Sequence, residues 1–379
     1  MIKSAKVRLR PNKEQEKQLR KSAGVARFAY NWALARQKEN YDNGGKFLSH
    51  YDLRKEFTKL KQTEEYSWLY ETSNNITKQA IKDACRAFEN FFAGRAEFPR
   101  FKSRRRSKPA FFNDNIKLKF KAEETGVGRF LIEKVGWVRI SEPERIVPEK
   151  FTNPRISFDG KYWYISVGQE TGKPNVQLNN ESIGIDLGIK SLAVCSNGMI
   201  FENINRTPKS RKQAKRLRRL QRKVSRKYQK NKEGSTFVKT RSIIKLEKKI
   251  RLTHRKIANT RLNHIHQATT ALVKTKPSRI VAEDLNVRGM MKNRHLSKAI
   301  GEQGFNLFLI ILAYKCAFYG IEFEKADRFY PSSKKCINCG SIKKDLKLWE
   351  RTYKCGVCGN EADRDYQASI NLARYRKTA

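Results

Sequence analysis

The chain has 379 residues, and 82 Lys and Arg against 37 Asp and Glu give it a formal net charge of +45. Because 39% of the residues are hydrophobic, the chain can build packed cores, which excludes disorder throughout. At roughly 150 residues per domain, the length predicts two or three domains. Duplex DNA carries about one charge per 1.7 Å of its axis, so the excess of cations favours nucleic acid as a partner over an acidic membrane surface.

The apolar runs and the cysteines indicate the compartment. The basic segment 1–13 is not followed by the apolar run of a secretory signal, and the longest apolar run, 307–314, is shorter than the ~20 residues that span a bilayer. Four of the seven cysteines form two C-x-x-C pairs, a usage typical of a reducing compartment and a metal site and not of a disulfide framework. We expect a cytoplasmic protein without a membrane partner.

The N-terminal part begins with a basic strand at 2–10, after which Asn12 predicts a helix start of the capping-box type. Apolar residues then recur at helical spacing, as in Phe28, Trp32 and Ala35. This spacing predicts a helical region in which these three side chains belong to the buried face.

From about residue 98 the apolar period changes to two, and Asp159-Gly160 is typical of a hairpin turn. The alternation predicts a small β-barrel or sheet. We expect the strand at 2–10 to belong to it, so that the helical region is an insertion.

The segment 98–112, FPRFKSRRRSKPAFF, interleaves basic residues with phenylalanines. Cations beside aromatic rings suit phosphate contact and base stacking, so the segment is a candidate nucleic-acid contact. The alternative is a solvated loop whose aromatic residues join the core. The candidate contacts are Arg100, Lys102, Arg104 and Arg105.

A second hairpin is predicted around Asn197-Gly198, and beyond it the segment 206–261 holds 23 Lys or Arg and two acids. Its apolar stripes predict two helices that are separated near Gly234. A charge run is usually a solvated face, but this one lacks the acids that would form intrahelical ion pairs. We therefore expect nucleic-acid contact, and the candidate residues on the first of these helices are Arg218, Arg219, Arg222 and Arg226.

Two C-x-x-C pairs follow a helix predicted at 305–319 and a strand predicted at 321–326. Each pair aims two thiolates at one point, and two pairs complete the tetrahedral sulfur set that zinc favours. Since no coordination position stays open, we expect one structural Zn²⁺ and no catalytic zinc. The ligands would be Cys336, Cys339, Cys355 and Cys358.

Three acids form the candidate catalytic site. Asp186 lies inside the apolar run G-I-D-L-G, Glu283 lies in the strand predicted at 279–285, and Asp365 opens the final helix. Singly, such acids are usually helix caps or solvated strand ends, but a carboxylate inside an apolar strand is costly unless a metal or hydrogen bonds receive it. A hairpin with Asp, a later strand with Glu and a C-terminal helix with Asp are the layout of an RNase H-like nuclease, whose carboxylates can hold two Mg²⁺ ions about 4 Å apart.

Other chemistries lack their motifs. There is no G-x-x-x-x-G-K-[ST], which argues against an ATP-driven helicase, and Gly126-x-Gly128 is too short to be a nucleotide-binding loop. There is no H-E-x-x-H either, and His264 and His266 fall on different faces of a predicted helix, so they do not form a ligand pair.

Several segments, in order, resemble the TnpB family of RNA-guided nucleases, which bacterial and archaeal insertion sequences carry and which are related to type V CRISPR effectors. They cover nearly the whole chain. The segments are RPNKEQEKQLRKSAGVARFAYNWAL, FPRFKSRRRSKPAFF, GIDLGIKSLAV, IVAEDLNVRGM, KKCINCG with YKCGVCG, and DRDYQASINLA.

The resemblance implies an α+β multidomain fold. A wedge-like β-barrel, formed by 1–10 and 96–180, would be interrupted by a helical recognition lobe at 11–95. An RNase H-like, RuvC-type α/β nuclease domain would follow over 181–379. It would contain the basic helical pair, 206–275, and a zinc-ribbon insertion, 330–362.

The resemblance also assigns the magnesium ligands. It implies Asp186, Glu283 and Asp365, the last being the second acid of the family's D-x-D-x-N pattern. In this sequence Gln367 stands where Asn is usual, which keeps Asp363 as an alternative third ligand.

Members of this family bind a guide RNA encoded by their own element, recognise a short motif beside the target and cut double-stranded DNA that pairs with the guide. The resemblance implies the same here, with Mg²⁺, Zn²⁺ and guide RNA as cofactors. The sequence does not decide the oligomeric state, for which a monomer is our expectation, and we expect a prokaryotic cytoplasm, with the protein at the nucleoid when bound to DNA. The alternatives are a nuclease-inactive RNA-guided repressor, an Asp-Asp-Glu transposase, whose acids run in another order, and a basic structural RNA-binding protein.

Overall fold

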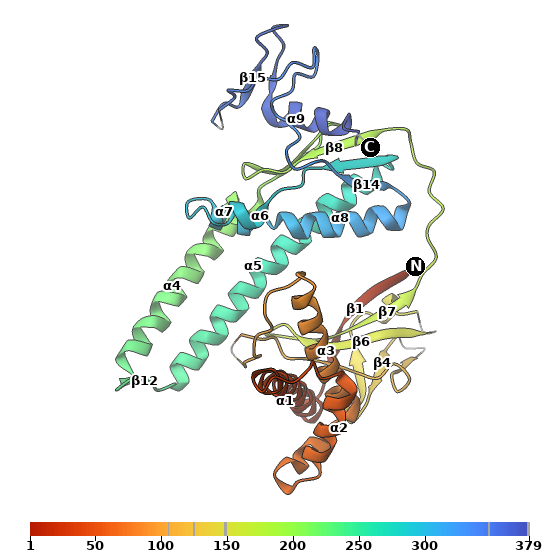
Figure 1. Ribbon diagram of the computed structural model, residues 1–379, viewed down its shortest axis with the longest axis vertical. Coiled ribbons are helices and arrows are strands. Elements are labelled where there is room, and N and C mark those ends of the chain that lie inside the picture. The colour runs from red at the N-terminus through yellow and green to blue at the C-terminus, as the bar shows by residue number, and fades with distance from the viewer. Residues whose placement is uncertain (105, 124–125, 148–149, 348, 377–379) are drawn as a thin grey trace. The chain divides into compact units, whose positions relative to one another are not determined.

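The computed structural model describes residues 1–104, 106–123, 126–147, 150–347 and 349–376. The chain divides into two compact units, Met1–Thr171 and Gly172–Ala379, and each has its own hydrophobic core (Figure 1). Over these described ranges, no helix is both long and apolar enough to cross a bilayer.

The first unit combines helices with an antiparallel sheet. Its helices are α1 (Lys13–Asp42), α2 (His50–Lys61), α3 (Asn74–Phe92) and the 3₁₀ helices η1 (Glu64–Glu71) and η2 (Pro143–Arg145). Its strands are β1 (Ile2–Arg10), β2 (Ala110–Phe112), β3 (Lys119–Ala122), β4 (Gly128–Ile132), β5 (Gly136–Ile140), β6 (Phe151–Phe158) and β7 (Trp163–Glu170).

The seven strands lie in the order β2-β6-β7-β1-β5-β4-β3. Ala5, Val7 and Leu9 of β1 alternate into the core, as the period of a strand requires. β1 pairs with β7 and with β5, which lie beyond the helices in sequence. The first strand therefore joins the sheet formed by the later strands, as the alternating pattern predicts.

The N-terminus of α1 is the predicted capping box. Asn12 Oδ1 accepts a hydrogen bond from the backbone N–H of Gln15 at 2.8 Å, and Gln15 Oε1 accepts one from the backbone N–H of Asn12 at 3.1 Å. These bonds satisfy two donors that the first turn of a helix leaves unpaired.

The buried face of α1 differs from the prediction. Ala29 and Ala33 are buried, whereas Phe28 and Trp32 are only partly buried and Ala35 is exposed. α1 packs against α3, and small alanine side chains allow two helices to approach closely. The aromatic residues are left beside this contact.

The second unit contains the remaining elements. Its helices are η3 (Ile204–Arg206), α4 (Pro208–Lys230), α5 (Arg241–Lys274), α6 (Val287–Met290), α7 (Ser297–Gln303), α8 (Phe305–Tyr319) and α9 (Arg364–Ala373). Its strands are β8 (Ser182–Asp186), β9 (Ser191–Cys195), β10 (Ile200–Glu202), β11 (Lys232–Glu233), β12 (Thr236–Phe237), β13 (Arg279–Ala282), β14 (Glu322–Lys325), β15 (Thr352–Lys354) and β16 (Glu361–Asp363).

The main sheet of this unit has the order β10-β9-β8-β13-β14. β8, β9 and β10 pair antiparallel, whereas β13 and β14 run parallel to β8. The hairpin predicted at Asn197-Gly198 joins β9 to β10. The strand predicted at 279–285 is shorter, because its pairing with β8 ends at Ala282.

α9 packs directly against β8 at Gly184. A Cβ atom on this glycine would lie 1.9 Å from the carbonyl oxygen of Ser369 and 2.3 Å from the backbone nitrogen of Ala373. Ser182 Oγ also donates to the carbonyl of Ala373 at 2.9 Å. Only glycine allows the helix backbone to lie this close to the strand.

α4 and α5 form the predicted pair of basic helices (Figure 1). The short hairpin of β11 and β12 fills the break, and Gly234 adopts a φ of +57° there. Leu220 and Val224 of α4 are half-buried, and Tyr228 Oη donates to Glu247 Oε1 at 2.6 Å. The apolar stripes therefore pack while the basic residues between them face solvent.

Candidate functional site

The sheet of the second unit brings two of the predicted acids together. Asp186 is the last residue of β8, and Glu283 directly follows β13. These strands are parallel neighbours, with Ile185 opposite Ala282, so the two acids lie side by side at one end of the sheet. Asp365 lies in the first turn of α9, which packs against β8.

The electrostatics of this cluster are those of an anionic site. Burial raises the pKa of Asp186 well above its usual range, and the neighbouring charges of Glu283 and Asp365 raise it further. Burial likewise raises the pKa of Glu283, although Ser332 Oγ donates to its Oε1 at 2.7 Å. Arg364 is the nearby cation that opposes both shifts. A second cation would therefore be stabilised here, and an oxygen-only set of donors fits Mg²⁺.

The two acids of the D-x-D pattern have different surroundings. Asp363 Oδ1 accepts hydrogen bonds from the backbone N–H groups of Asp365 and Tyr366, at 3.0 and 2.9 Å, and so caps α9. The side chain of Asp365 is 16% exposed, and Oδ1 lies 3.6 Å from Nη1 of Arg351 and 3.9 Å from Nε of Arg364. The charge of Asp365 raises the pKa of both Asp186 and Glu283, whereas that of Asp363 raises the pKa of Asp186.

Two further residues support the acids and were missed in the sequence. Ser332 holds Glu283, and Asn371 Nδ2 donates to the backbone carbonyls of Ser332 and Lys335, at 2.7 and 2.6 Å. A single serine and a single asparagine give no pattern that predicts these contacts. Gln367, which departs from the family's pattern, is buried, and within the described part of the chain its Nε2 has no hydrogen-bond partner.

The four predicted cysteines form one cluster, in which all four Sγ atoms lie within 4.8 Å of one another. Cys336 Sγ is 3.6 Å from Cys358 Sγ, and Cys339 Sγ is 3.6 Å from Cys355 Sγ. A glycine with positive φ follows each C-x-x-C pair, with φ of +75° at Gly340 and +72° at Gly359. The two pairs therefore make equivalent turns.

Backbone donors surround one of these sulfurs. The N–H groups of Cys358 and Val357 donate to Cys355 Sγ at 3.5 and 3.4 Å, and Ser341 Oγ lies 3.2 Å from it. These donors lower the pKa of Cys355 to about 5, which favours the thiolate. The cluster could hold a metal ion, and a set of four sulfurs at this spacing fits zinc.

The predicted basic residues fall into two groups. Arg218, Arg219, Arg222 and Arg226 are exposed on α4, and with Lys249 of α5 they line a hollow of about 810 Å³. In the other group, Arg104 is exposed, Arg100 pairs with Glu97 at 2.8 Å, and Arg105 lies outside the described residues. Lys102 differs from them, because its Nζ lies 3.5 Å from the centre of the Tyr30 ring and burial lowers its pKa.

Three family models match this chain. They are a "Helix-turn-helix domain" of the IS605 OrfB group over residues 1–46, a "Probable transposase" model of the same group over 164–294, and a "Cas12f1-like, TNB domain" over 305–372. The chain is also 32% identical to "Putative RNA-guided DNA endonuclease InsQ" of Escherichia coli K12, over 98% of this chain and 91% of that protein. The chain belongs to the TnpB family.

A second relative agrees with the TnpB assignment. "Putative RNA-guided DNA endonuclease" of Streptomyces pristinaespiralis is 32% identical, over 97% of this chain and 87% of that protein. Among solved structures, the protein of the "Cas12f1-sgRNA-target DNA complex" has a similar fold, with a TM-score of 0.61, 13% identity and coverage of 98% of both chains. At 13% identity, this similarity shows only that the two chains share a fold.

The contact at Gly184 gives a first prediction. Gly184→Ala would force α9 away from β8, because the new methyl group meets backbone atoms that cannot rotate aside. We expect a loss of about 1–3 kcal/mol in the free energy of unfolding, as for other overpacked sites. Gly172→Ala is the control, because no atom lies within 4 Å of its Cβ position. Denaturant unfolding of the two variants measures the difference, and equal stabilities would contradict the close approach.

Proposed function

We propose that the chain is an RNA-guided DNA endonuclease of an insertion sequence. It binds a guide RNA, recognises a short motif beside the target and cuts the double-stranded DNA that pairs with the guide. The observation that carries the proposal is the placement of Asp186 and Glu283 at one end of the sheet and of Asp365 in the first turn of α9, in a chain that matches proteins named as such nucleases over nearly their whole length.

The acid cluster is proposed as an RNase H-like, RuvC-type nuclease site. Its support is a sheet in which an antiparallel hairpin carries Asp186 and a parallel neighbour leads to Glu283. The three carboxylates would hold two Mg²⁺ ions, which activate water and stabilise the leaving oxygen when bound. The task of this chain's own residues is to hold the carboxylates: Ser332 orients Glu283, and Asp363 fixes the turn from which Asp365 projects.

The other parts receive roles by the same proposal. The four-cysteine cluster binds a structural Zn²⁺ within the insertion 330–362. The sheet of 1–10 and 96–180 is the wedge domain, and the helices of 11–95 are the recognition lobe. The protein acts as a monomer in the cytoplasm of a prokaryote, at the nucleoid when bound to DNA. Base pairing reads the target, while basic residues hold the heteroduplex by its backbone.

The experiment that tests this function starts from the protein with its copurifying RNA. Sequencing that RNA, and then offering a DNA target that matches it beside a library of flanking sequences, should yield Mg²⁺-dependent cleavage. Binding of a matched target without cleavage would favour the repressor. Strand transfer without any dependence on RNA would favour the transposase.

The basic hollow on α4 gives a second prediction. Replacing Arg218, Arg219 and Arg222 together with glutamine should weaken RNA or DNA binding and reduce the slope of log affinity against log salt by up to about 2–3, since each phosphate contact contributes about 0.7–0.9. The charge-matched control replaces the same residues with lysine and should keep most of the slope. An unchanged slope in the glutamine variant would exclude phosphate contacts at this hollow.

A further inference from the structure

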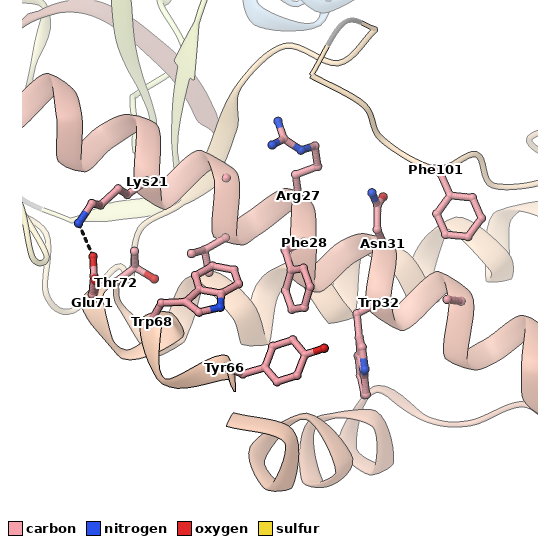
Figure 2. Close-up of a pocket in the computed structure, with 13 residues that line it drawn as sticks. Lys21, Arg27, Phe28, Asn31, Trp32, Tyr66, Trp68, Glu71, Thr72 and Phe101 are labelled. Atoms are coloured by element: carbon pink, nitrogen blue, oxygen red, sulfur yellow. Dashed lines mark hydrogen bonds and ion pairs between the residues drawn. The ribbon is translucent and has the colours of Figure 1, made fainter. Parts of the chain in front are cut away.

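The first unit contains a cavity of about 850 Å³ that none of the sites above uses. Its aromatic lining comes from three segments (Figure 2): Phe28 and Trp32 lie on α1, Tyr66 and Trp68 on η1, and Phe101 on the loop after α3. This volume lies within the range of roughly 300–1,000 Å³ that is typical of small-ligand sites. We call it the aromatic cavity.

One wall of the aromatic cavity is a packed set of rings. The centre of the Phe28 ring lies 5.3 Å from that of Trp68 and 5.7 Å from that of Tyr66. Phe101 stands apart from these rings (Figure 2), is 57% exposed and makes no ring contact with any residue that the structure describes. Phe101 therefore offers an uncovered ring face to a flat ligand that enters beside the wall.

The backbone next to Phe101 is tied to α1. Asn31 Nδ2 donates to the carbonyl of Lys102 at 2.8 Å, and the backbone N–H of Lys102 donates to Asn31 Oδ1 at 2.8 Å. This pair of bonds ties the loop to α1. The backbone of this loop is therefore preorganised, which reduces the entropy lost when a ligand binds.

Gly24 keeps the cavity open on the side of α1. It lies inside a long helix, where glycine lowers stability relative to other residues, and no atom lies within 4 Å of the position of its absent Cβ. A larger side chain at this position would enter the space beside the rings.

The charges around the cavity select the kind of flat ligand. Lys21 is paired with Glu71, but the guanidinium of Arg27 has no hydrogen bond or ion pair with any described residue. The loop that carries Phe101 also bears the exposed Arg104. A nucleotide suits both the aromatic rings and the guanidinium of Arg27, because its base can stack on the rings and its phosphate can bind Arg27.

We propose that the aromatic cavity binds one unpaired nucleobase of a single strand of nucleic acid. The base stacks on the ring of Phe101 beside the wall of Phe28 and Trp68, and Arg27 binds its phosphate. The inference rests on the proposed function in one respect, namely that nucleic acid is the ligand of this chain. The strand is either RNA or DNA, since both supply this chemistry.

The experiment compares affinities of the full-length protein for three fluorescent single strands of about twelve units: oligothymidylate, oligouridylate and an abasic deoxyribose phosphate chain. We expect the wild type to bind a base-bearing strand about 5- to 150-fold more tightly than the abasic strand, the range that one stacked base produces. Tighter binding of oligouridylate assigns the site to an RNA strand, and tighter binding of oligothymidylate assigns it to DNA.

The variants connect this preference to the cavity. Phe101→Ala should remove the preference for base-bearing strands. Phe92→Ala should keep this preference, because Phe92 is 65% exposed on α3 outside the cavity. Gly24→Leu should also remove it without lowering the Tm, since leucine favours the helix while filling the cavity. Arg27→Gln should weaken binding of all three strands and lower the salt slope by about 0.7.

The proposal is overturned if the wild type binds the abasic strand as tightly as the others, or if the preference survives both Phe101→Ala and Gly24→Leu. Guided cleavage by the wild type is measured in parallel. Cleavage without a base preference refutes the aromatic cavity alone. A base preference without cleavage refutes the nuclease proposal alone.

Discussion

Asp186→Asn is expected to reduce guided DNA cleavage on the order of 10³-fold or more while leaving the protein folded. A metal-bound carboxylate supports transition-state stabilisation of several kcal/mol, and each ~1.4 kcal/mol changes the rate tenfold. The folded state should not suffer, because burial and three neighbouring acids already disfavour the charge on Asp186. In the presence of a chelator the Tm of the variant should equal or exceed that of the wild type. Cleavage kinetics and thermal unfolding on the same preparations measure both effects.

The matched control for this prediction lies at the start of α9. Asp365→Asn should lose cleavage as Asp186→Asn does, whereas Asp363→Asn should retain it, because asparagine caps a helix as well as aspartate and its Oδ1 can accept the same two backbone N–H groups. Guide and target binding should remain nearly unchanged in all three variants, since the affinity comes from contacts that other parts of the protein make to the phosphate backbone of the nucleic acid. If Asp363→Asn is the inactive variant, the third ligand is Asp363.

Asp186 could be singled out in the sequence because it conflicts with its local setting, whereas Glu283 and Asp365 are selected by the order of the elements that carry them. A carboxylate at the end of the apolar strand of Asp186 requires compensation, and that requirement is visible without a structure. The supporting contacts are not visible, because they join residues far apart in sequence. Asn371 reaches Ser332 and Lys335 across 39 and 36 residues, and Gly184 is a glycine because of a helix that begins at Arg364.

The helical region illustrates a second limit. α1 has an alanine face and an aromatic face, and both repeat at helical spacing, so periodicity alone does not tell which one meets α3. The larger rings of Phe28 and Trp32 make their face the stronger expectation, but these rings are only partly buried at the edge of the core, whereas Ala29 and Ala33 are fully buried. Close approach of two helix backbones favours the smaller side chains. Phe28 and Trp32 pack against the core on one side and line the aromatic cavity on the other.

The cysteine cluster gives the other large expected effect. Wild-type protein should carry about one zinc, and Cys336→Ser combined with Cys355→Ser should lose it, because two of four thiolates are then absent. The segment around the cluster has little core of its own, since its buried set is Cys336, Tyr353 and Cys355 with Leu346 packed against them. Without the metal we expect rapid proteolysis within 330–362 while the two larger cores persist. Cys85→Ala, in the core of the first unit, is the control and should keep its zinc.

Loss of zinc should also slow cleavage, because the cluster and the acid site share a connection through α9. Asn371 donates to the carbonyl of Lys335, and Arg374 Nη1 donates to the carbonyl of Ile337 at 2.6 Å, so the last turns of α9 hold the chain that enters the cluster. When that chain loosens, α9 and Asp365 lose part of their support, and a fall of roughly 10–100-fold is expected, as when other supporting contacts of a metal site are removed. Metal analysis, limited proteolysis and cleavage rates on the double variant measure the three effects together. Stoichiometric zinc in that variant would refute the assigned ligands, and full cleavage activity without zinc would refute the connection through α9.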